Sequence, residues 1–379
     1  MERVLIVISL FIFLLSGCQY ADKDVIVASD RLLNLHEKRQ IPSEFYGHNV
    51  RYPIKTSSSR SFIEISEWFD EHTVLYLKDE EGIARLLKHN VTNGDEQGFF
   101  QTEEAISNVT ANHDYSYYAI ETVTRDYDVS LYLIDRDGFI RYQIQELGED
   151  YSVFWNPYQP EELVVVSFLP NWESQLYYVN VANGQISPIE LDQTFIQWLD
   201  INRLGYLHWD QDEPSYFSSL FSYDMKTNQK VLVEEDILSF FSFPNHNYLI
   251  IDVDSIDELM STYTFFKENE TIRQIEVPIL NTYSEQWWVP YFTFDQMNSI
   301  FYYLRPFYSG NYVDYEDGFE LVALDIRSGD EEVIIEVEND APLKLSPDGE
   351  SMLYGYQYEH LIDLNGNQMV DLFVQSNRF

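Results

Sequence analysis

The sequence predicts an all-β protein assembled from repeated units, and three observations lead to this prediction. From Phe62 onward, short runs of aromatic and β-branched residues alternate with Gly, Pro, Asn and Asp, which is typical of strands joined by turns. No segment keeps a sustained helical period. A strand–turn–strand pattern recurs, and the Asp or Asn before its first four turns is spaced by 45, 45 and 44 residues: Asn90, Asp135, Asn180 and Asp224. Four strands in each unit of this length favour a β-propeller blade over a solenoid repeat.

The chain begins with a segment typical of export. Arg3 precedes an apolar run from Val4 to Leu15, which is short for a membrane-spanning helix. Leu15-Ser16-Gly17-Cys18 follows and resembles the lipobox of bacterial lipoproteins. The resemblance implies cleavage before Cys18 and attachment of fatty acyl chains such as palmitate, which would anchor the chain on the extracytoplasmic face of the cell membrane. The alternatives are an ordinary signal peptide with an incidental cysteine, or an uncleaved anchor.

These signals divide the chain into three predicted parts. A signal peptide is expected at 1–17, the lipidated Cys18 and a polar tether at 18–61, and a β-propeller at 62–379. The tether is polar and interrupted by proline, which disfavours regular structure. Cys18 is the only cysteine, so an exported domain has no disulfide and must be stabilised by its core. The hydrophobic fraction of 45% and aromatic fraction of 16% are sufficient for such a core.

The formal net charge is −41, from 64 acidic residues against 23 Lys and Arg. Such a surface repels the phosphates of nucleic acids and anionic lipid headgroups, so DNA or RNA binding is excluded. The acids are spread along the chain, which favours a solvating surface suited to a saline or alkaline exterior. A specific polycationic partner is the alternative interpretation.

Gln175–Ile189 is the clearest single unit, with two strand-like runs around Asn183-Gly184. Asn-Gly predicts a type I′ hairpin turn, because both central residues of that turn need positive φ. The Asp or Asn before each turn is expected to accept a hydrogen bond within it. Counting turns predicts seven units, with turns near Gly94, Gly138, Gly184, Asn228, Asn269, Gly329 and Gly366.

A second landmark lies upstream of the hairpin in several units. Trp68 precedes Tyr76 by eight residues, and Trp198 precedes Tyr206 by the same spacing. In the last unit, Ser346-Pro-Asp-Gly349 stands in the corresponding place, where Pro and Asp-Gly favour a turn. These landmarks suggest that the units are equivalent blades.

The repeats resemble those of TolB-type propellers, with Ser346-Pro-Asp-Gly349 the nearest match. Together with the lipobox and the acidic body, the chain resembles the YqgU-like bacterial lipoproteins. This resemblance implies a six-bladed propeller and no established reaction, whereas the turns number seven. One unit shared between the chain ends would reconcile the two counts, with Phe62–Ile65 completing a blade begun by Met352–Val374. Such a shared blade would leave no exposed sheet edge at the closure.

Motifs for chemistry are absent from the sequence. The histidines lack metal-ligand spacing, and there is no Gly-x-Ser-x-Gly elbow or phosphate-binding glycine loop. We therefore expect no catalytic residue, no metal and no cofactor. Asp252, Asp254 and Asp257 are an alternative Ca²⁺ site, although they lack the glycine and terminal glutamate of an EF-hand loop.

Long connections point to function. We expect them after the innermost strands, gathered on one face around the channel mouth, where loops on a rigid scaffold commonly bind ligands. The predicted function is a ligand- or protein-binding module at the cell surface without catalysis of its own. A carbohydrate-active hydrolase or lyase using loop carboxylates is the alternative. The predicted ligand-binding residues are Trp172, Trp209, Tyr216 and Tyr308.

Overall fold

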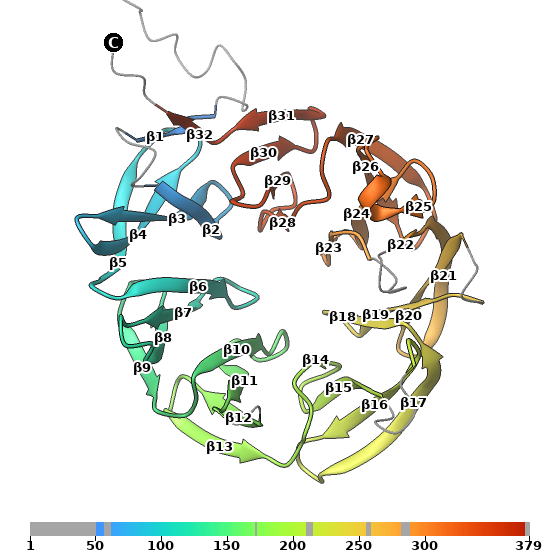
Figure 1. The fold of residues 1–379 in the computed structure, drawn as a ribbon, viewed down its shortest axis with the longest axis horizontal. Helices are drawn as coiled ribbons and strands as arrows, with labels where there is room; N and C mark the ends of the chain where they lie inside the picture. The colour runs from blue at the N-terminus through green and yellow to red at the C-terminus, as the bar shows by residue number, and fades with distance from the viewer. Residues whose placement is uncertain are drawn as a thin grey trace, which may run out of the picture. The chain divides into compact units, whose positions relative to one another are not determined.

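The computed structural model describes residues 51–56, 62–170, 173–209, 215–254, 259–281 and 289–375. The described residues form seven four-stranded antiparallel sheets arranged as blades around a central axis (Figure 1). Within these ranges, one short 3₁₀ turn, η3 (Tyr312–Asp314), is the only helix, and no helix is long and apolar enough to cross a membrane. The predicted all-β propeller is therefore confirmed.

Each blade takes its strands in chain order from the centre outward. Blades 1 to 4 are β2–β5 (Phe62–Asp70, Thr73–Glu80, Ile83–Asn90, Glu96–Thr102), β6–β9 (Ala105–Ala111, Tyr117–Val123, Val129–Asp135, Ile140–Gln145), β10–β13 (Asp150–Trp155, Glu162–Phe168, Ser174–Asn180, Gln185–Ile189) and β14–β17 (Ile196–Trp198, Arg203–His208, Ser218–Asp224, Gln229–Ile237). Blades 5 to 7 are β18–β21 (Ser239–Phe243, Asn247–Asp252, Met260–Lys267, Glu270–Pro278), β23, β24, β26 and β27 (Phe292–Asp295, Ile300–Pro306, Phe319–Asp325, Glu331–Val337) and β28–β31 (Leu343–Leu345, Ser351–Tyr354, His360–Asp363, Gln368–Asp371). Two parallel pairs lie outside the blades: β1 (Ile54–Thr56) with β32 (Phe373–Gln375), and β22 (Leu280–Asn281) with β25 (Gly310–Asn311).

The seven predicted turns each join the third strand of a blade to the fourth, so the count of seven units is confirmed. The blade shared between the chain ends is wrong. Phe62–Ile65 opens β2, the innermost strand of a blade made wholly from the N-terminal part of the domain. All four strands of blade 7 come from the C-terminal part. Each end has enough strand-forming sequence to complete its own sheet, so no strand is exchanged.

The ring is closed instead by contacts between blade 7 and blade 1. Trp68 is fully buried, and its indole Nε1 donates to the carbonyl of Lys344 on the innermost strand of blade 7, at 3.1 Å. Trp198 makes the same contact between blades 4 and 3, where its indole donates to the carbonyl of Phe154 at 2.9 Å. The two tryptophans recognised as equivalent in sequence therefore perform the same task, and the closure is an ordinary blade-to-blade junction.

An ion pair between the buried Glu67 and the partly buried Lys344 adds to this junction. The Lys344 ammonium lies 2.8 Å from Oε2 of Glu67, which is 5% exposed and also accepts from the amides of Trp68 and Ala111. Burial alone would lower the pKa of Lys344, but the negative charge of Glu67, with Tyr358 and the hydrogen bond to Glu67, outweighs burial and raises it. Lys344 therefore keeps its positive charge, which the Glu67 carboxylate balances across the junction between blades 7 and 1.

The core lies between neighbouring blades. In β11, Leu163 to Val166 are all fully buried. Val164 and Val166 pack with residues of blade 4, whereas Leu163 and Val165 pack with residues of blade 2. A strand covered on both faces becomes a continuous apolar run instead of an alternating one.

The hairpin turns differ from the prediction in one respect. Asn183 does not have positive φ, while Gly184 has φ 68°, so the turn is not type I′. Asn180 pairs with Gln185 around a four-residue loop, and its side-chain oxygen accepts from the amide of Asn183 at 3.2 Å. This side-chain bond stabilises the longer loop. The expected acceptor role is confirmed at Asn90, Asp135, Asn180, Asp224, Asp325 and Asp363.

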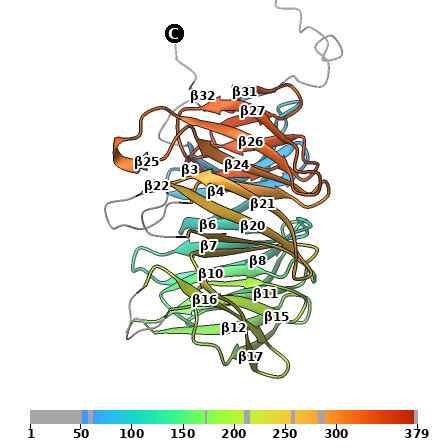
Figure 2. The same cartoon turned by 90° about the vertical axis from the view of Figure 1, so that its right-hand side faces the viewer.

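Antiparallel alternation gives the ring two different faces. We call the face with the first-to-second and third-to-fourth connections the turn face, and the opposite one the long-loop face. Figure 2 shows the ring edge-on, with β22 and β25 projecting from the long-loop face. The long connections do lie on one face, but they follow the second strand of their blades, not the innermost one as expected: β7, β11, β15, β19 and β24.

The described chain enters on the turn face. The guanidinium of Arg51 donates to the hydroxyl of Ser351 at 3.0 Å, and the amide of Tyr52 donates to the carbonyl of Val91 at 2.7 Å. The ring of Tyr52 packs beside Gly94, in the third-to-fourth turn of blade 1. β1 then runs within the segment that was expected to be tether. The predicted signal peptide and the chain before Arg51 lie outside the described residues.

Candidate functional site

The predicted binding residues that the structure describes lie on separate parts of the long-loop face. Trp172 and, in the alternative Ca²⁺ site, Asp257 lie outside the described residues. Trp209 and Tyr216, 40% and 37% exposed, belong to the β15–β16 connection of blade 4. Tyr308, 49% exposed, belongs to the β24–β26 connection of blade 6, with blade 5 between them. The structure therefore does not bring these residues into one pocket.

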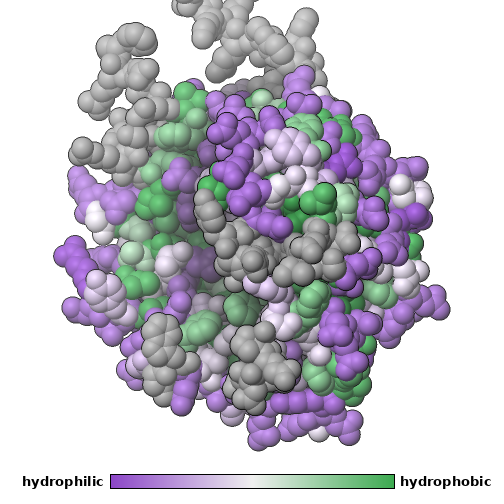
Figure 3. Space-filling view, turned by 45° about the vertical axis from the view of Figure 1, so that its right-hand side comes forward, coloured by the Kyte–Doolittle hydropathy of each residue, from purple (hydrophilic) through white to green (hydrophobic). Residues whose placement is uncertain are grey.

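Exposed aromatic rings are nonetheless concentrated on this face. Among the described residues, Tyr52 and Phe139 are the exposed aromatics on the turn face. Figure 3 shows that most of the visible surface is hydrophilic, with hydrophobic patches between the polar residues. Scattered exposed rings are ordinary, but a set concentrated on one face supports a role in binding. The long-loop face carries Tyr127, Phe195, Trp209, Tyr216, Tyr291, Phe307, Tyr308, Tyr312 and Tyr356.

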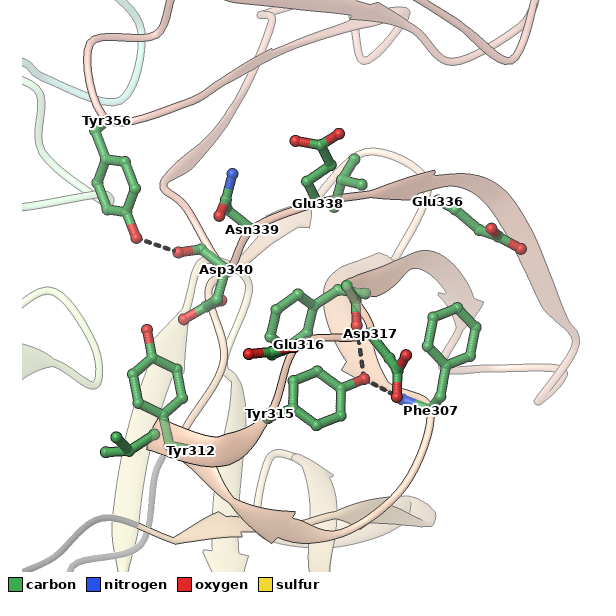
Figure 4. A pocket seen from close by; sticks show the side chains of 14 residues that line it. Phe307, Tyr312, Tyr315, Glu316, Asp317, Glu336, Glu338, Asn339, Asp340 and Tyr356 are labelled. Atoms are coloured by element: carbon green, nitrogen blue, oxygen red, sulfur yellow. Dashed lines mark hydrogen bonds between the residues drawn. The ribbon is translucent and has the colours of Figure 1, made fainter.

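A cavity of about 900 Å³ opens on this face between blades 6 and 7. It is formed by the β24–β26 connection, the β27–β28 connection and Tyr356 of the β29–β30 connection (Figure 4). Its described lining contains no Lys, Arg or His. Five carboxylates line it, from Glu316, Asp317, Glu336, Glu338 and Asp340, together with aromatic rings from Phe307, Tyr312, Tyr315, Phe319 and Tyr356.

The long connection of blade 6 is held in shape by Tyr315. Its hydroxyl accepts from the amide of Phe307 at 2.9 Å and donates to the carbonyl of Gly318 at 2.6 Å, which ties the two ends of the loop together (Figure 4). Its ring also packs against Tyr308 and Phe319. Tyr315 is therefore structural, and the cavity wall that it supports is ordered before any ligand binds.

Asp340 forms the floor of the cavity. Its side chain is 4% exposed, and Oδ1 accepts from the amide of Tyr291 at 2.9 Å. Its backbone carbonyl accepts from the hydroxyl of Tyr356 at 2.8 Å. Burial raises the pKa of Asp340 to about 7, against the opposing effect of the Tyr291 hydrogen bond. Near neutral pH this carboxyl therefore exchanges between its charged and neutral forms.

Three tyrosines lie close to Asp340, and we call them the tyrosine cage: Tyr291, whose amide donates to the carboxylate, Tyr312, and Tyr356, whose hydroxyl donates to the backbone carbonyl. They are 43%, 37% and 62% exposed. Figure 4 shows Tyr312 and Tyr356 on either side of Asp340. Burial raises the pKa of Tyr312, and the nearby charges of Tyr356, Asp340 and Tyr291 raise it further. Tyr312 and Tyr356 line the cavity together with Asp340, and Tyr291 adjoins them through its amide bond to the carboxylate.

The residues predicted to bind a ligand included neither Asp340 nor any of the cage tyrosines. Tyr291 and Asp340 belong to connections between blades, whereas the prediction considered only the long connections within blades. Both kinds of connection emerge on the same face of an antiparallel propeller. Including the short segments just before each innermost strand would have identified Asn339-Asp340.

The turn face is closed over the axis by contacts between blades that are not neighbours. Gln296 of blade 6 lies 2.8 Å from Nε2 of His113 on blade 2. His246 of blade 5 stacks on Tyr158 of blade 3, with ring centroids 5.2 Å apart. A cavity of about 330 Å³ lies behind these contacts. Within the described part of the chain, no group of three or more His, Cys, Asp or Glu is placed to hold a metal ion.

The chain resembles known proteins over most of its length. It is 23% identical over 310 residues to an uncharacterized lipoprotein, YqgU, of Bacillus subtilis, covering 81% of this chain and 83% of that one. The crystal structure of an uncharacterized Listeria monocytogenes protein matches with a TM-score of 0.77 at 21% identity, over 87% of this chain and 99% of that one. The β-propeller domain of the Trilobed protease of Pyrococcus furiosus, which has an open velcro topology, matches with a TM-score of 0.58 at 11% identity, over 84% and 100%.

The family described as the YqgU-like 6-bladed beta propeller domain matches residues 90–355. These residues take in blades 2 to 6 whole, the outermost strand of blade 1 and the two innermost strands of blade 7. The structure thus has seven blades where the family description gives six. Since the match covers well over half of the chain, the chain belongs to the family of YqgU-like 6-bladed beta propeller domains.

Proposed function

We propose that this chain is a lipid-anchored, extracytoplasmic receptor that binds a cationic ligand in the cavity between blades 6 and 7. The anchor is supported by the lipobox-like Leu15-Ser16-Gly17-Cys18 and by the lipoprotein of Bacillus subtilis to which the chain is similar. Cys18 is the proposed lipid attachment site.

The composition of the cavity carries the proposal. Five carboxylates and five aromatic rings line it, and none of its described lining residues is basic. Together with a formal net charge of −41, this gives the cavity a negative potential that attracts cations and repels anions. Aromatic walls favour an organic cation over a fully hydrated inorganic one, because apolar surface is buried on binding.

The residues proposed from sequence fit a second, outer role. Trp209, Tyr216 and Tyr308 lie on the same face as the cavity, and Trp172 belongs to the long connection of blade 3. Exposed aromatic side chains of this kind contribute strongly when a macromolecular partner covers them. A ligand carried on a protein or polymer would therefore contact both the cavity and these rings.

Calorimetry with a short lysine peptide tests the proposal. The full-length protein in a non-ionic detergent is expected to bind the peptide, to bind it less tightly as salt rises, and not to bind its acetylated form. A variant with Glu316→Gln, Asp317→Asn, Glu336→Gln and Glu338→Gln is expected to lose affinity at least tenfold. The matched control neutralises exposed carboxylates on the outer strands of blades 4 and 5: Glu234, Glu235, Glu270 and Glu276. Equal losses in the two variants would show that net charge and not the cavity is responsible.

One observation favours the alternative of a carbohydrate-active hydrolase or lyase. A carboxyl such as Asp340, with a pKa of about 7, has the protonation behaviour of a general acid, and carboxylates lie in the same cavity. Screening the protein against cell-wall and extracellular polysaccharides separates the two functions. Turnover that disappears in Asp340→Asn would establish the enzyme, whereas retention of ligand without turnover would establish the receptor.

A further inference from the structure

The tyrosine cage and Asp340 come from four separate connections. Tyr291 immediately precedes β23, Tyr312 lies in η3, Asp340 precedes β28, and Tyr356 lies between β29 and β30. Two hydrogen bonds connect these segments. The Tyr291 amide donates to the Asp340 carboxylate, and the Tyr356 hydroxyl donates to the Asp340 backbone carbonyl. Rings on exposed loops usually turn toward the core or lie apart. Here Tyr312 and Tyr356 line the cavity on either side of its most deeply buried carboxylate (Figure 4).

The position of the η3 tyrosine is set by its local structure. The side chain of Asn311 caps the turn by accepting from the amide of Val313 at 2.9 Å. Asn311 is itself held by the parallel pairing of β25 with β22, in which Leu280 and Asn281 lie opposite Gly310 and Asn311. A side-chain cap and an extra pair of strands therefore hold Tyr312 in place. A loop that only contacts solvent needs neither.

The chemistry of the cage selects among cations. Oδ1 of Asp340 is already used by the Tyr291 amide, so one carboxylate oxygen remains for a ligand at the floor. A primary ammonium needs acceptors for three N–H groups when it is desolvated, and a metal ion needs several oxygen ligands. An alkylated ammonium needs neither. Its positive charge is spread over methyl groups that pack against the electron-rich faces of tyrosine rings.

We propose that the tyrosine cage over Asp340 binds an alkylated ammonium group, such as the trimethylammonium of choline or a methylated amine. The inference rests on the proposed cationic receptor and names the chemical class that its deepest part takes. The rings supply the walls, the Asp340 carboxylate supplies the balancing charge, and the surrounding carboxylates attract the ligand to the mouth.

Choline and its neutral isostere 3,3-dimethylbutan-1-ol provide the test, because they differ in charge and hardly in shape. We expect the full-length protein in a non-ionic, non-zwitterionic detergent to bind choline at least tenfold more tightly than the isostere, and more tightly than methylammonium. Sodium at equal ionic strength is expected not to compete. Equal binding of choline and the isostere, or competition by sodium at choline's own concentration, would overturn the proposal.

Variants connect the binding to the cage. Tyr312→Leu and Tyr356→Leu are expected to weaken choline binding at least tenfold, whereas Tyr356→Phe, which keeps the ring, is expected to bind choline within a few-fold of the original protein. The control is Phe195→Leu, 79% exposed on the same face between blades 3 and 4, which should have no effect. Equal effects of Phe195→Leu and Tyr356→Leu would overturn the assignment.

The two proposals can fail separately. If lysine-peptide binding depends on Glu316, Asp317, Glu336 and Glu338 while choline does not bind, the cage inference is wrong and the cationic receptor stands. If choline binds through the cage and the peptide does not bind, the cage is established and the proposed macromolecular cation is wrong. Binding of neither probe overturns both.

Discussion

At the scale of single residues, Asp340 and Lys344 show two ways in which the fold treats a buried charge. Lys344 has a full partner in Glu67 and is held in its charged form. Asp340 accepts one amide hydrogen bond and has no basic neighbour among the described lining of the cavity, so burial favours its neutral form. The first arrangement suits a structural seam. The second leaves a carboxylate whose negative charge a cationic ligand can balance.

The titration of Asp340 should be visible in stability. The groups that face it are the hydroxyl of Tyr356 and the phenols of Tyr291, Tyr312 and Tyr354. Burial raises the pKa of these last three phenols, so they remain neutral below about pH 10. An acid with a raised folded-state pKa binds more protons when folded, so its contribution is present below about pH 4 and is lost as pH rises through about 7. Asp340→Asn should therefore gain stability relative to the original protein over this window, by at most about 4 kcal/mol.

Chemical denaturation of both proteins at pH 5 and pH 8 checks this expectation. The control is Glu338→Gln, which removes an exposed carboxylate two residues earlier. If the unfolding free energy of the original protein and of Asp340→Asn depended on pH in the same way, the raised pKa of the Asp340 carboxyl would be contradicted. Choline binding should change in the opposite sense, strengthening as Asp340 ionises, and this pH dependence should vanish in Asp340→Asn.

The Lys344–Glu67 pair predicts a different pattern. Lys344→Met removes the cation and leaves Glu67, 5% exposed, without its charge partner, which should cost about 3 kcal/mol of unfolding free energy. The double variant Lys344→Met, Glu67→Gln should recover much of this loss, because the Gln oxygen can still accept from the Trp68 amide. Urea denaturation measures both. A single variant as stable as the original protein would show that the pair does not contribute to ring closure.

At the scale of elements, the outer hairpins depend on one repeated device. The side-chain oxygen of Asn90 accepts from the amides of Thr92 and Asn93 at 2.9 and 3.1 Å, and from the Thr92 hydroxyl at 2.7 Å. Either Asn or Asp can supply this oxygen, which explains why both occur at the repeated position. The residue is selected by its acceptor and not by its charge.

Substitutions at Asn90 test that conclusion. Asn90→Ala removes the acceptor and should destabilise the protein by about 1 to 2 kcal/mol, whereas Asn90→Asp should be nearly neutral. Thermal and chemical denaturation of the two variants give the comparison. A large loss for Asn90→Asp would mean that the amide group, which lies 3.5 Å from the Thr73 hydroxyl, matters more than the acceptor.

At the scale of the whole molecule, local signals predicted the repeats well. The seven turns and the equivalence of Trp68 and Trp198 follow from patterns that neighbouring residues create, and the structure confirms them. The cage could not be predicted in this way. Asp340 meets Tyr291 across 49 residues and Tyr356 across 16, and only the stacking of blades 6 and 7 brings them together. The resemblance implied six blades, whereas the structure has the seven that the turns predicted. The shared closing strand was wrong because pattern does not show where each end completes its sheet.

The proposed anchor gives a further prediction for the whole chain. Cys18→Ala should leave the protein unprocessed or release it from the membrane, because the acceptor of the lipid is lost. Fractionation of cells with mass analysis of the purified protein checks this. Recovery of the original protein from the medium without lipid mass would exclude lipid anchoring.

The entry of the chain on the turn face affects how the cavity would be presented by a protein anchored at Cys18. Arg51 and Tyr52 are fastened beside Ser351 and Val91, at the end of the ring opposite the tyrosine cage. The described chain therefore joins the propeller on the face opposite the mouth of the cavity. From Cys18 to Arg51 the backbone can extend to about 110 Å at most. With the proposed lipid at Cys18, the point where the chain joins the propeller would face the bilayer and the cavity mouth would face away from it.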